Sequence, residues 1–155
     1  MTTMFMPVLL LLVLLSMAPS SRLVAAQGGF MTNCSWQDAQ FDTQLGLLEM
    51  YCNNDDWVIF DYDWSTLNTS LCFGNNGGEL IPREEGGYFK SCELCDVDKG
   101  ITKTQYLLTC HCWGTEGQFK ETTIDLNETI WNHDGTLGCF SQSGEKAEER
   151  PEPRS

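Results

Sequence analysis

A tandem repeat marked by cysteines is the strongest constraint on how this chain can fold. The stretch GGFMTNC, which begins at position 28, returns as GGYFKSC 58 residues later, so Cys34 falls on Cys92. The same shift brings Cys52 onto Cys110, with an interval of 18 residues in both copies. A unit of this size is too small to bury a sheet alone, so we expect two copies that share one core.

Alternating apolar positions predict strands at matching places in the two copies. In LLEMYC, which ends at Cys52, and in YLLTCHC, which ends at Cys112, every second side chain is apolar or a cysteine. A period of two is typical of a half-buried strand. A Gly-Gly pair at 77–78 and an Asp-Gly pair at 134–135 provide the glycines that hairpin turns require. No long apolar stripe with a helical period is present, so we predict an all-β fold.

Composition indicates where the domain ends. Beyond position 140, SQSGEKAEERPEPRS has no aromatic residue and no aliphatic residue larger than alanine, so we expect residues 141–155 to be a disordered acidic tail. We place one domain at 27–140, with repeat one at about 28–85 and repeat two at about 86–140. The acidic aromatic segment between Asn53 and Trp64 is the main difference between the copies.

The first residues predict a route out of the cell. The apolar run PVLLLLVLLSMA is too short for a comfortable membrane span, and small residues follow it. We interpret residues 1–26 as a signal peptide that is cleaved after Ala26, which predicts a secreted, extracellular protein without membrane insertion. Removal of the single arginine in this segment changes the formal charge from −13 to −14. Such an anionic surface argues against binding to nucleic acid.

Cysteine usage and the scarcity of catalytic pairs exclude further classes. All eight cysteines follow the signal peptide, and an even number in a secreted chain predicts disulfides, in place of a zinc site at CELC and CHC. With two histidines in the chain, His111 and His133, a triad is difficult to assemble, and no two carboxylates are paired by position. We therefore predict a protein that is not an enzyme and that has no metal or cofactor.

The order of the motifs along the chain is similar to that of a known family. The motifs span Gly28 to about Phe140. They are an aromatic residue separated from a cysteine by three residues, a strand that ends in a cysteine, and IDLNETIWNHDGTL with its counterpart in repeat one. This set resembles the cyanovirin-N homology (CVNH) family of lectins. The resemblance implies a pseudo-symmetric domain in which each half is a three-stranded sheet plus a β-hairpin, with strands exchanged between the repeats. It also implies binding of mannose-rich glycans in a shallow pocket at each far end.

The resemblance also implies a disulfide pattern. The family pairs correspond to Cys34–Cys52 and Cys92–Cys110, and for the other four cysteines we favour Cys95–Cys112 and Cys72–Cys139. Partners in an antiparallel ladder have a constant sum of positions, which leaves Cys92–Cys112 with Cys95–Cys110 as an alternative. Both versions pair Cys72 with Cys139.

The binding residues implied by the resemblance lie in turns and at strand ends. A neutral glycan offers hydroxyl groups, which rigid amides, carboxylates and hydroxyls can bind at low entropic cost. The first pocket would use Thr32, Asn33, Asn53, Asp55, Asn132 and Asp134. The second pocket would use Asn75, Gly77, Lys90, Ser91 and His111, and it lacks a carboxylate at Gly77. Trp113 and Trp131 are aromatic residues that could stack on sugar rings, although core packing is the simpler role.

Three further expectations concern modification, partners and assembly. Asn33, Asn68 and Asn127 each begin an N-glycosylation triplet, so we expect a glycoprotein. The partners would be glycans, on a glycoprotein or cell-surface target. The alternative is a secreted protein that uses the same scaffold to bind a protein partner without binding sugar. The chain would be a monomer or a domain-swapped dimer that uses the IPREEGG segment as a hinge.

Overall fold

The computed structural model describes residues 28–55, 62–98, 104–147 and 149–151. The predicted signal peptide lies outside these residues. The described part consists of short strands, with only single 3-10 turns as helical structure. In chain order the elements are η1 (Phe30–Thr32), β1 (Cys34–Asp42), β2 (Leu47–Asn53), β3 (Tyr62–Asn68), η2 (Thr69–Leu71), β4 (Phe73–Asn75), β5 (Leu80–Pro82), η3 (Tyr88–Lys90), β6 (Cys92–Asp98), β7 (Leu107–Trp113), β8 (Phe119–Asp125), η4 (Leu126–Glu128), β9 (Trp131–His133), β10 (Thr136–Cys139), β11 (Gln142–Ser143) and β12 (Glu145–Ala147).

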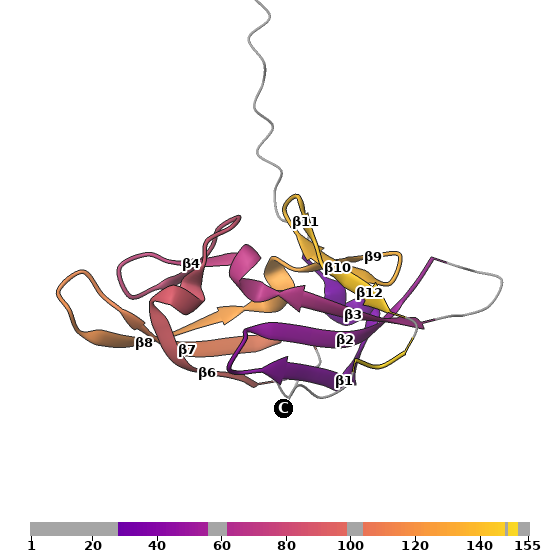
Figure 1. Cartoon of the computed structure of the whole chain (residues 1–155), viewed down its shortest axis with the longest axis horizontal. Coiled ribbons are helices and arrows are strands. Elements are labelled where there is room, and N and C mark those ends of the chain that lie inside the picture. Colours follow the sequence, from indigo (N-terminus) through magenta and orange to yellow (C-terminus); the bar gives the residue numbers. More distant parts are fainter. Residues whose placement is uncertain (1–27, 56–61, 99–103, 148, 152–155) are drawn as a thin grey trace, which may run out of the picture.

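Each repeat builds one antiparallel sheet, and the two sheets lie side by side along the long axis of the molecule (Figure 1). Repeat one forms the order β1-β2-β3, and repeat two forms β6-β7-β8. In β2 and β7 the residues alternate between buried and partly exposed positions, as the period of two predicts. The all-β fold with two related halves is thus confirmed.

The hairpins are exchanged between the repeats, as the resemblance implied. The β4–β5 hairpin of repeat one packs on the sheet of repeat two, where the Leu80 N–H donates to Thr122 Oγ1 across 3.0 Å. The β9–β10 hairpin of repeat two packs on the sheet of repeat one, where the Leu137 N–H donates to Ser65 Oγ across 2.8 Å. These two bonds occupy equivalent positions in the halves. Each hairpin therefore packs on the sheet of the other repeat.

One continuous core results from this exchange. Phe30 and Leu48 from repeat one and Tyr106, Leu108 and Ile130 from repeat two are fully buried in a single cluster. Burial of large apolar side chains supplies most of the stabilisation of a domain of this size. The shared cluster makes the two repeats one folding unit.

The disulfide pattern corrects one prediction. The structure forms Cys34–Cys52 and Cys72–Cys139 as expected, but the predicted Cys92–Cys110 and Cys95–Cys112 pairs are wrong. The bonds are Cys92–Cys112 and Cys95–Cys110, which follow the ladder alternative.

The reason for the error is the register of the second sheet. Cys92 lies directly opposite Cys112 in the β6–β7 ladder, as Cys34 lies opposite Cys52 in the β1–β2 ladder. The second interval is 20 residues and the first is 18, so the constant shift of 58 selected Cys110 in place of Cys112. Cys110 instead pairs with Cys95, which lies in the irregular part of β6.

The predicted disorder of residues 141–155 is also wrong for the first part of that segment. Gln142–Ser143 extends the β9–β10 hairpin, and Glu145–Ala147 adds a fourth strand to the sheet of repeat one beside β3. Strand addition uses backbone hydrogen bonds, so a segment without large apolar side chains can still be ordered at a sheet edge. Further along, the Arg150 guanidinium lies 5.0 Å from the centre of the Trp64 ring.

The structure describes the two ends of the acidic aromatic segment. β2 ends at Asn53 and β3 begins at Tyr62, so the segment includes the connection of a hairpin. Trp57, Phe60 and their neighbours over 56–61 lie outside the described residues.

Candidate functional site

Hydrogen bonds bring the three predicted segments of the first pocket together. The Asn53 N–H at the end of β2 donates to the Asn33 carbonyl across 2.8 Å, and Asn132 Nδ2 of β9 donates to the Asn53 carbonyl across 2.9 Å. The Asp55 N–H donates to Asp134 Oδ1 across 3.1 Å. These five predicted residues form one connected group, which we call the first end.

The sixth predicted residue, Thr32, lies beside this group, and its hydroxyl bonds locally. Thr32 Oγ1 donates to the Gly29 carbonyl across 2.8 Å. Thr32 and Asn33 are exposed at the rim of a hollow of about 450 Å³. The hollow is lined by Thr32, Asn33, Cys34, Ser35, Trp36, Asp38, Tyr51 and Tyr62. The first end therefore opens onto a larger depression in the surface.

The aromatic wall of this hollow consists of residues that were not among the predicted binding residues. The rings of Tyr51 and Tyr62 stack with their centres 5.1 Å apart, and the Trp64 ring lies 5.3 Å from Tyr51. Alternation in LLEMYC assigns Tyr51 to the outer face of its strand. Its meeting with Tyr62 depends on the β2–β3 register, in which Tyr62 is opposite Asn53. That register is not visible before strand pairing is known.

The two amide atoms of Asn132 differ in how they are used. The Asn53 carbonyl can only accept a hydrogen bond, which fixes Nδ2 of Asn132 on that side. Its Oδ1 is buried and accepts no hydrogen bond within the described part of the chain. A buried acceptor without a donor is costly, and it favours a water or a ligand that donates to it.

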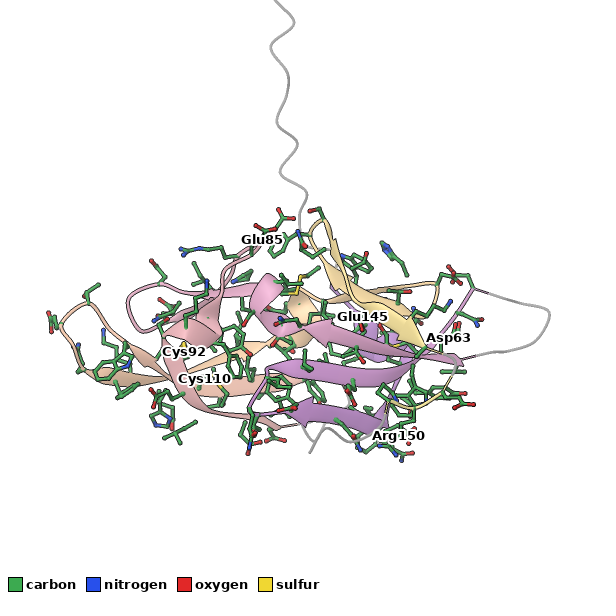
Figure 2. All side chains as sticks on the ribbon, in the orientation of Figure 1. Asp63, Glu85, Cys92, Cys110, Glu145 and Arg150 are labelled. Carbon is green, nitrogen blue, oxygen red and sulfur yellow. A yellow bond between two sulfur atoms is a disulfide. The ribbon has the colours of Figure 1, made fainter. Side chains whose placement is uncertain are left out.

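The turn after Asn132 rests on a charged residue of β3. Asp134 and Gly135 both have positive φ, at 50° and 75°, and a Cβ on Gly135 would lie 2.9 Å from Asp63 Oδ2. Asp63 lies at the end of the molecule where β3 begins (Figure 2). Burial alone would raise the pKa of Asp63, but hydrogen bonds from Lys146 and Asn54 and the charge of Lys146 together lower it. Asp63 is therefore an anion beneath the turn.

At the opposite end, Asn75 of β4 has the position that Asn132 has in the first end. Asn75 Nδ2 donates to the Trp113 carbonyl across 2.9 Å and to Ser91 Oγ across 3.0 Å. The Trp113 N–H in turn donates to the Ser91 carbonyl. We call Asn75, Ser91 and Trp113 the second end. Here the amide oxygen is already satisfied, because it accepts from the Gly78 N–H across 2.7 Å.

The other residues predicted for the second pocket do not join this group. His111 lies in β7 with Nε2 3.7 Å from a Glu121 carboxylate oxygen. Gly77 lies in the β4–β5 turn with φ of 64°, and Lys90 ends η3. Among the described contacts, none of these three predicted residues forms a hydrogen bond with the side chain of Asn75. The second pocket is thus assembled only in part.

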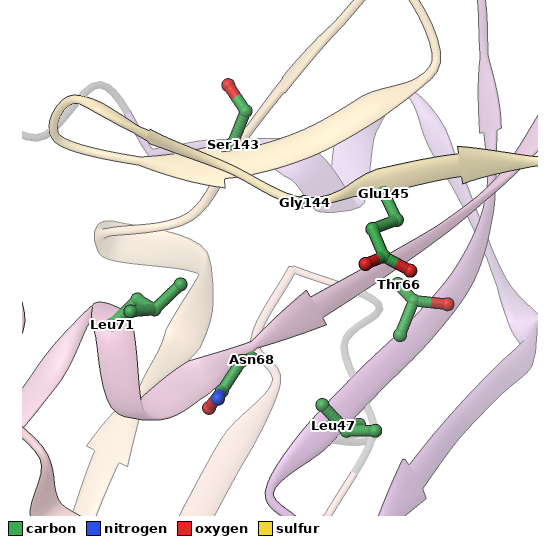
Figure 3. Close-up of a pocket in the computed structure, with 7 residues that line it drawn as sticks. All are labelled: Leu47, Thr66, Asn68, Leu71, Ser143, Gly144 and Glu145. Carbon is green, nitrogen blue, oxygen red and sulfur yellow. The ribbon is translucent and has the colours of Figure 1, made fainter.

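A second hollow, of about 250 Å³, contains none of the predicted binding residues (Figure 3). It lies between β3, η2 and the strand β12, and the Glu145 side chain points from β12 toward Thr66. Its lining consists of Leu47, Thr66, Asn68, Leu71, Ser143, Gly144 and Glu145. The exposed glycosylation candidate Asn68 is part of this lining.

The other two glycosylation candidates differ in how their amides are used. Asn33 is exposed at the first end. Asn127 is tied into the fold, because Oδ1 accepts from the Met31 N–H and Nδ2 donates to the Thr104 carbonyl, each across 3.0 Å. An attached glycan on Asn127 would replace one of the two Nδ2 hydrogens, which leaves a single N–H to donate to the Thr104 carbonyl.

The two tryptophans considered for stacking have different environments. Trp131 packs over Gly138, where an added Cβ would lie 2.1 Å from the indole, and its ring stacks on His133. Trp113 is 43% exposed and packs on Phe119, which is 40% exposed, with ring centres 3.8 Å apart. Trp131 therefore has a packing role, and Trp113 presents an open aromatic face.

The described residues contain neither a metal-binding cluster nor a membrane-spanning helix. No group of three or more His, Cys, Asp and Glu side chains there could hold a metal ion. No helix in the same residues is long and apolar enough to cross a membrane.

Comparisons with known proteins agree with this architecture. The family model for the CVNH domain matches residues 30–138. A microvirin:mannobiose complex has a TM-score of 0.61 at 26% identity, over 73% of this chain and 99% of that chain. The CVNH protein of Gibberella zeae has a TM-score of 0.61 at 23% identity, over 72% and 97%. No curated protein matches.

A more distant structure is a MoCVNH3 variant in complex with (N-GlcNAc)4. Its TM-score is 0.59 at 14% identity, over 73% of this chain and 97% of that chain. These structures have the same fold over nearly their whole length. Because the family model spans most of the chain and the exchanged hairpins and paired ends accompany it, the chain belongs to the CVNH family.

Proposed function

We propose that the protein is a lectin that binds mannose-rich glycans at the first end. The observation that carries the proposal is the buried Asn132 Oδ1, an acceptor that no described residue satisfies. A sugar hydroxyl can donate to this oxygen and accept from a neighbouring N–H at the same time. The mannobiose in the microvirin complex supports the choice of mannose.

The geometry around Asn132 suits a neutral, hydroxyl-rich ligand. The Asp134 side chain is 66% exposed, so its carboxylate is open to solvent while the Asp55 N–H fixes its position. Side chains that are already held in place lose little entropy when a ligand binds. A carboxylate that accepts from a hydroxyl forms one of the stronger hydrogen bonds available to a sugar.

The adjoining hollow extends the site beyond one sugar ring. Tyr51 and Tyr62 form an aromatic surface beside the polar groups of Asn33 and Ser35. Aromatic faces pack against the C–H faces of sugars while hydroxyls at the ring edge remain bonded. We therefore expect an oligosaccharide to bind more tightly than a single mannose.

The test is a glycan array with isothermal titration calorimetry on the mature protein and two matched variants. Asn132→Leu removes the amide at the first end, and Asn75→Leu makes the same change at the second end. We expect Asn132→Leu to reduce affinity for mannose-rich glycans by more than about 30-fold, because a hydrogen-bonding group in the site is lost. Asn75→Leu should bind like the wild type.

The outcomes separate the proposal from its rivals. Circular dichroism must first show that both variants are folded. Equal loss in both variants would place binding elsewhere or at both ends. Folded wild-type protein that binds no glycan, with Asn33 free of attached sugar, would sink the lectin proposal.

A second candidate function is binding to a protein partner at the second end. The observation in its favour is the exposed aromatic pair of Trp113 and Phe119, since exposed aromatic residues are enriched at protein interfaces. Binding of labelled protein to target cells before and after enzymatic removal of their glycans separates the two functions. A lectin loses binding after this treatment. A protein binder keeps it and loses it in the double variant Trp113→Ser with Phe119→Ser.

We further propose that the protein acts outside the cell after cleavage at Ala26. All eight cysteines are paired in the four disulfides, which supports an oxidising compartment. Mass spectrometry of protein from the culture medium would test the cleavage site and the glycan at each of Asn33, Asn68 and Asn127. An uncleaved N-terminus on the purified protein would contradict the proposal.

A further inference from the structure

We propose that Lys146, on the added strand β12, is a positioning residue for the first end, an inference that rests on the glycan-binding function proposed above. Lys146 Nζ donates to the Asp134 carbonyl across 2.7 Å and to Asp63 Oδ2 across 2.7 Å. It also lies 3.6 Å from Asp134 Oδ2. One ammonium group thus links the binding turn to the strand beneath it.

Strand β12 is placed to do this by its register. Lys146 pairs with Ser65 of β3, the residue whose hydroxyl accepts from the Leu137 N–H of the exchanged hairpin. The Gly144 N–H also donates to the Leu137 carbonyl across 2.8 Å. The tail strand and the hairpin therefore meet on the same part of β3, and the Lys146 side chain reaches the turn at the end of the hairpin.

The charges under the turn need this lysine. The Asp63 side chain is 11% exposed, and Asp134 carries a second carboxylate on the turn above it. Without Lys146 the two anions that share its ammonium group lose their common cation, and within the described part of the chain Asn54 Nδ2 is the neutral donor that remains to Asp63. Repulsion between like charges in a partly buried place would displace the turn. Asp134 Oδ1 would then lose its alignment with the Asp55 N–H.

The equivalent turn at the opposite end, between β4 and β5, packs on a lysine of β8 in place of an aspartate. Lys120 pairs opposite Cys112, which is the place of Asp63 opposite Cys52 in repeat one. A Cβ on Gly78 would lie 2.8 Å from Lys120 Cδ, as one on Gly135 would lie 2.9 Å from Asp63 Oδ2. This turn has Gly77 where the first end has Asp134, so it has no carboxylate at that position. The tail strand accompanies the end that has two acidic residues.

The tail strand lies outside the part of the chain that the family model matches. That match ends at residue 138, and the microvirin structure is covered over 99% of its length by 73% of this chain. Lys146 thus comes from a segment that the matched domain does not include.

The experiment compares wild type with Lys146→Met, Lys146→Arg and the control Lys120→Met. We expect Lys146→Met to weaken binding of a mannose-rich glycan about tenfold or more, because hydrogen bonds of a charged group are lost. Lys146→Arg keeps the charge and the donors, and it should restore affinity to within about threefold of the wild type. Lys120→Met removes a lysine from the opposite end and should bind like the wild type.

A second measurement keeps this inference separate from the lectin proposal. Amide ¹H–¹⁵N spectra should show shifted signals and faster hydrogen exchange at Asp55 and Gly135 in Lys146→Met, with recovery in Lys146→Arg. If the wild type binds no glycan but these changes occur, the lectin proposal fails and the positioning role stands. If Lys146→Met leaves both the spectra and the affinity unchanged, the positioning role is wrong.

A further variant covers the case in which Lys146→Met does not fold. The double variant Asp63→Asn with Lys146→Met removes the unpaired buried charge while it still lacks the bond to the Asp134 carbonyl. The inference predicts a folded protein whose affinity remains reduced about tenfold. Wild-type affinity in this double variant would overturn it.

Discussion

The two ends of the molecule use one backbone arrangement for different chemistry. In both, an asparagine of the exchanged hairpin donates to the carbonyl at the end of the central strand, Asn132 to Asn53 and Asn75 to Trp113. At the first end the amide oxygen accepts from none of the described residues, and at the second it accepts from the Gly78 N–H. The hydrogen-bonded frame therefore does not distinguish a candidate site from a closed turn. The unsatisfied amide oxygen and the charges around the frame distinguish the candidate site from the closed turn.

The largest effect should come from the bond that ties the halves together. The Cys72–Cys139 disulfide closes 67 residues, whereas Cys95–Cys110 closes 15 inside the loop closed by Cys92–Cys112. Replacement of Cys72 and Cys139 by serine should lower the free energy of unfolding by about 4 kcal/mol, because the unfolded chain gains freedom. Urea denaturation monitored by tryptophan fluorescence measures this. A loss below about 1 kcal/mol would mean that the shared core alone holds the halves together.

The next effect sharpens the charge difference between the ends. Asp63→Ala should destabilise the protein by about 2 kcal/mol, because it removes hydrogen bonds from Lys146 and Asn54 to a mostly buried carboxylate. The equivalent change Lys120→Ala removes an exposed side chain and should cost less than about 0.5 kcal/mol. Both are measured by urea denaturation. Equal costs would show that the two ends are electrostatically alike.

A smaller effect tests the extra disulfide of repeat two. By register, Ala39 and Met50 occupy in repeat one the places of Cys95 and Cys110, and all four side chains are buried. The double variant Cys95→Ala with Cys110→Met should fold and lose about 1 kcal/mol, since Cys92–Cys112 still closes the surrounding loop. Thermal unfolding by circular dichroism gives the answer. Failure to fold would show that repeat two depends on this bond.

The smallest effect concerns pH. Because Lys146 and Asn54 lower the pKa of Asp63 despite its burial, its contribution to stability is present above the ordinary aspartate pKa. It is lost as the pH falls through the lowered pKa of the folded state. The urea midpoint of the wild type should therefore fall more steeply below about pH 4 than that of Asp63→Asn. Parallel curves for the two proteins would contradict this role of Asp63.

The sequence predicted the architecture because the repeat carries it twice. Alternation in the two central strands and glycine pairs in the two hairpins are local signals, and each copy supports the other. The Cys92–Cys112 bond was predicted wrongly for a physical reason. The separation from Cys92 to Cys112 is two residues longer than that from Cys34 to Cys52, 20 against 18, and a constant shift cannot follow such a change in length.

Some residues of the candidate site could be predicted from the sequence and others could not. The polar residues of the first end lie next to cysteines and turns in the sequence, so their positions could be carried over from the resemblance. Tyr62 and Lys146 could not, because their roles depend on which strands become neighbours. The composition of the tail gave no warning that Glu145–Ala147 would add to a sheet, since backbone pairing leaves no mark in hydrophobicity.

The Cys72–Cys139 disulfide has a further effect if two chains assemble. It joins the residue after η2 in repeat one to the last residue of β10 in repeat two. If two molecules exchanged repeats through the segment between β5 and η3, each Cys72 would meet the Cys139 of the other molecule. The dimer would then be covalent and would run at twice the monomer mass on a non-reducing gel. Oxidation would make permanent whichever partner each chain had met while folding.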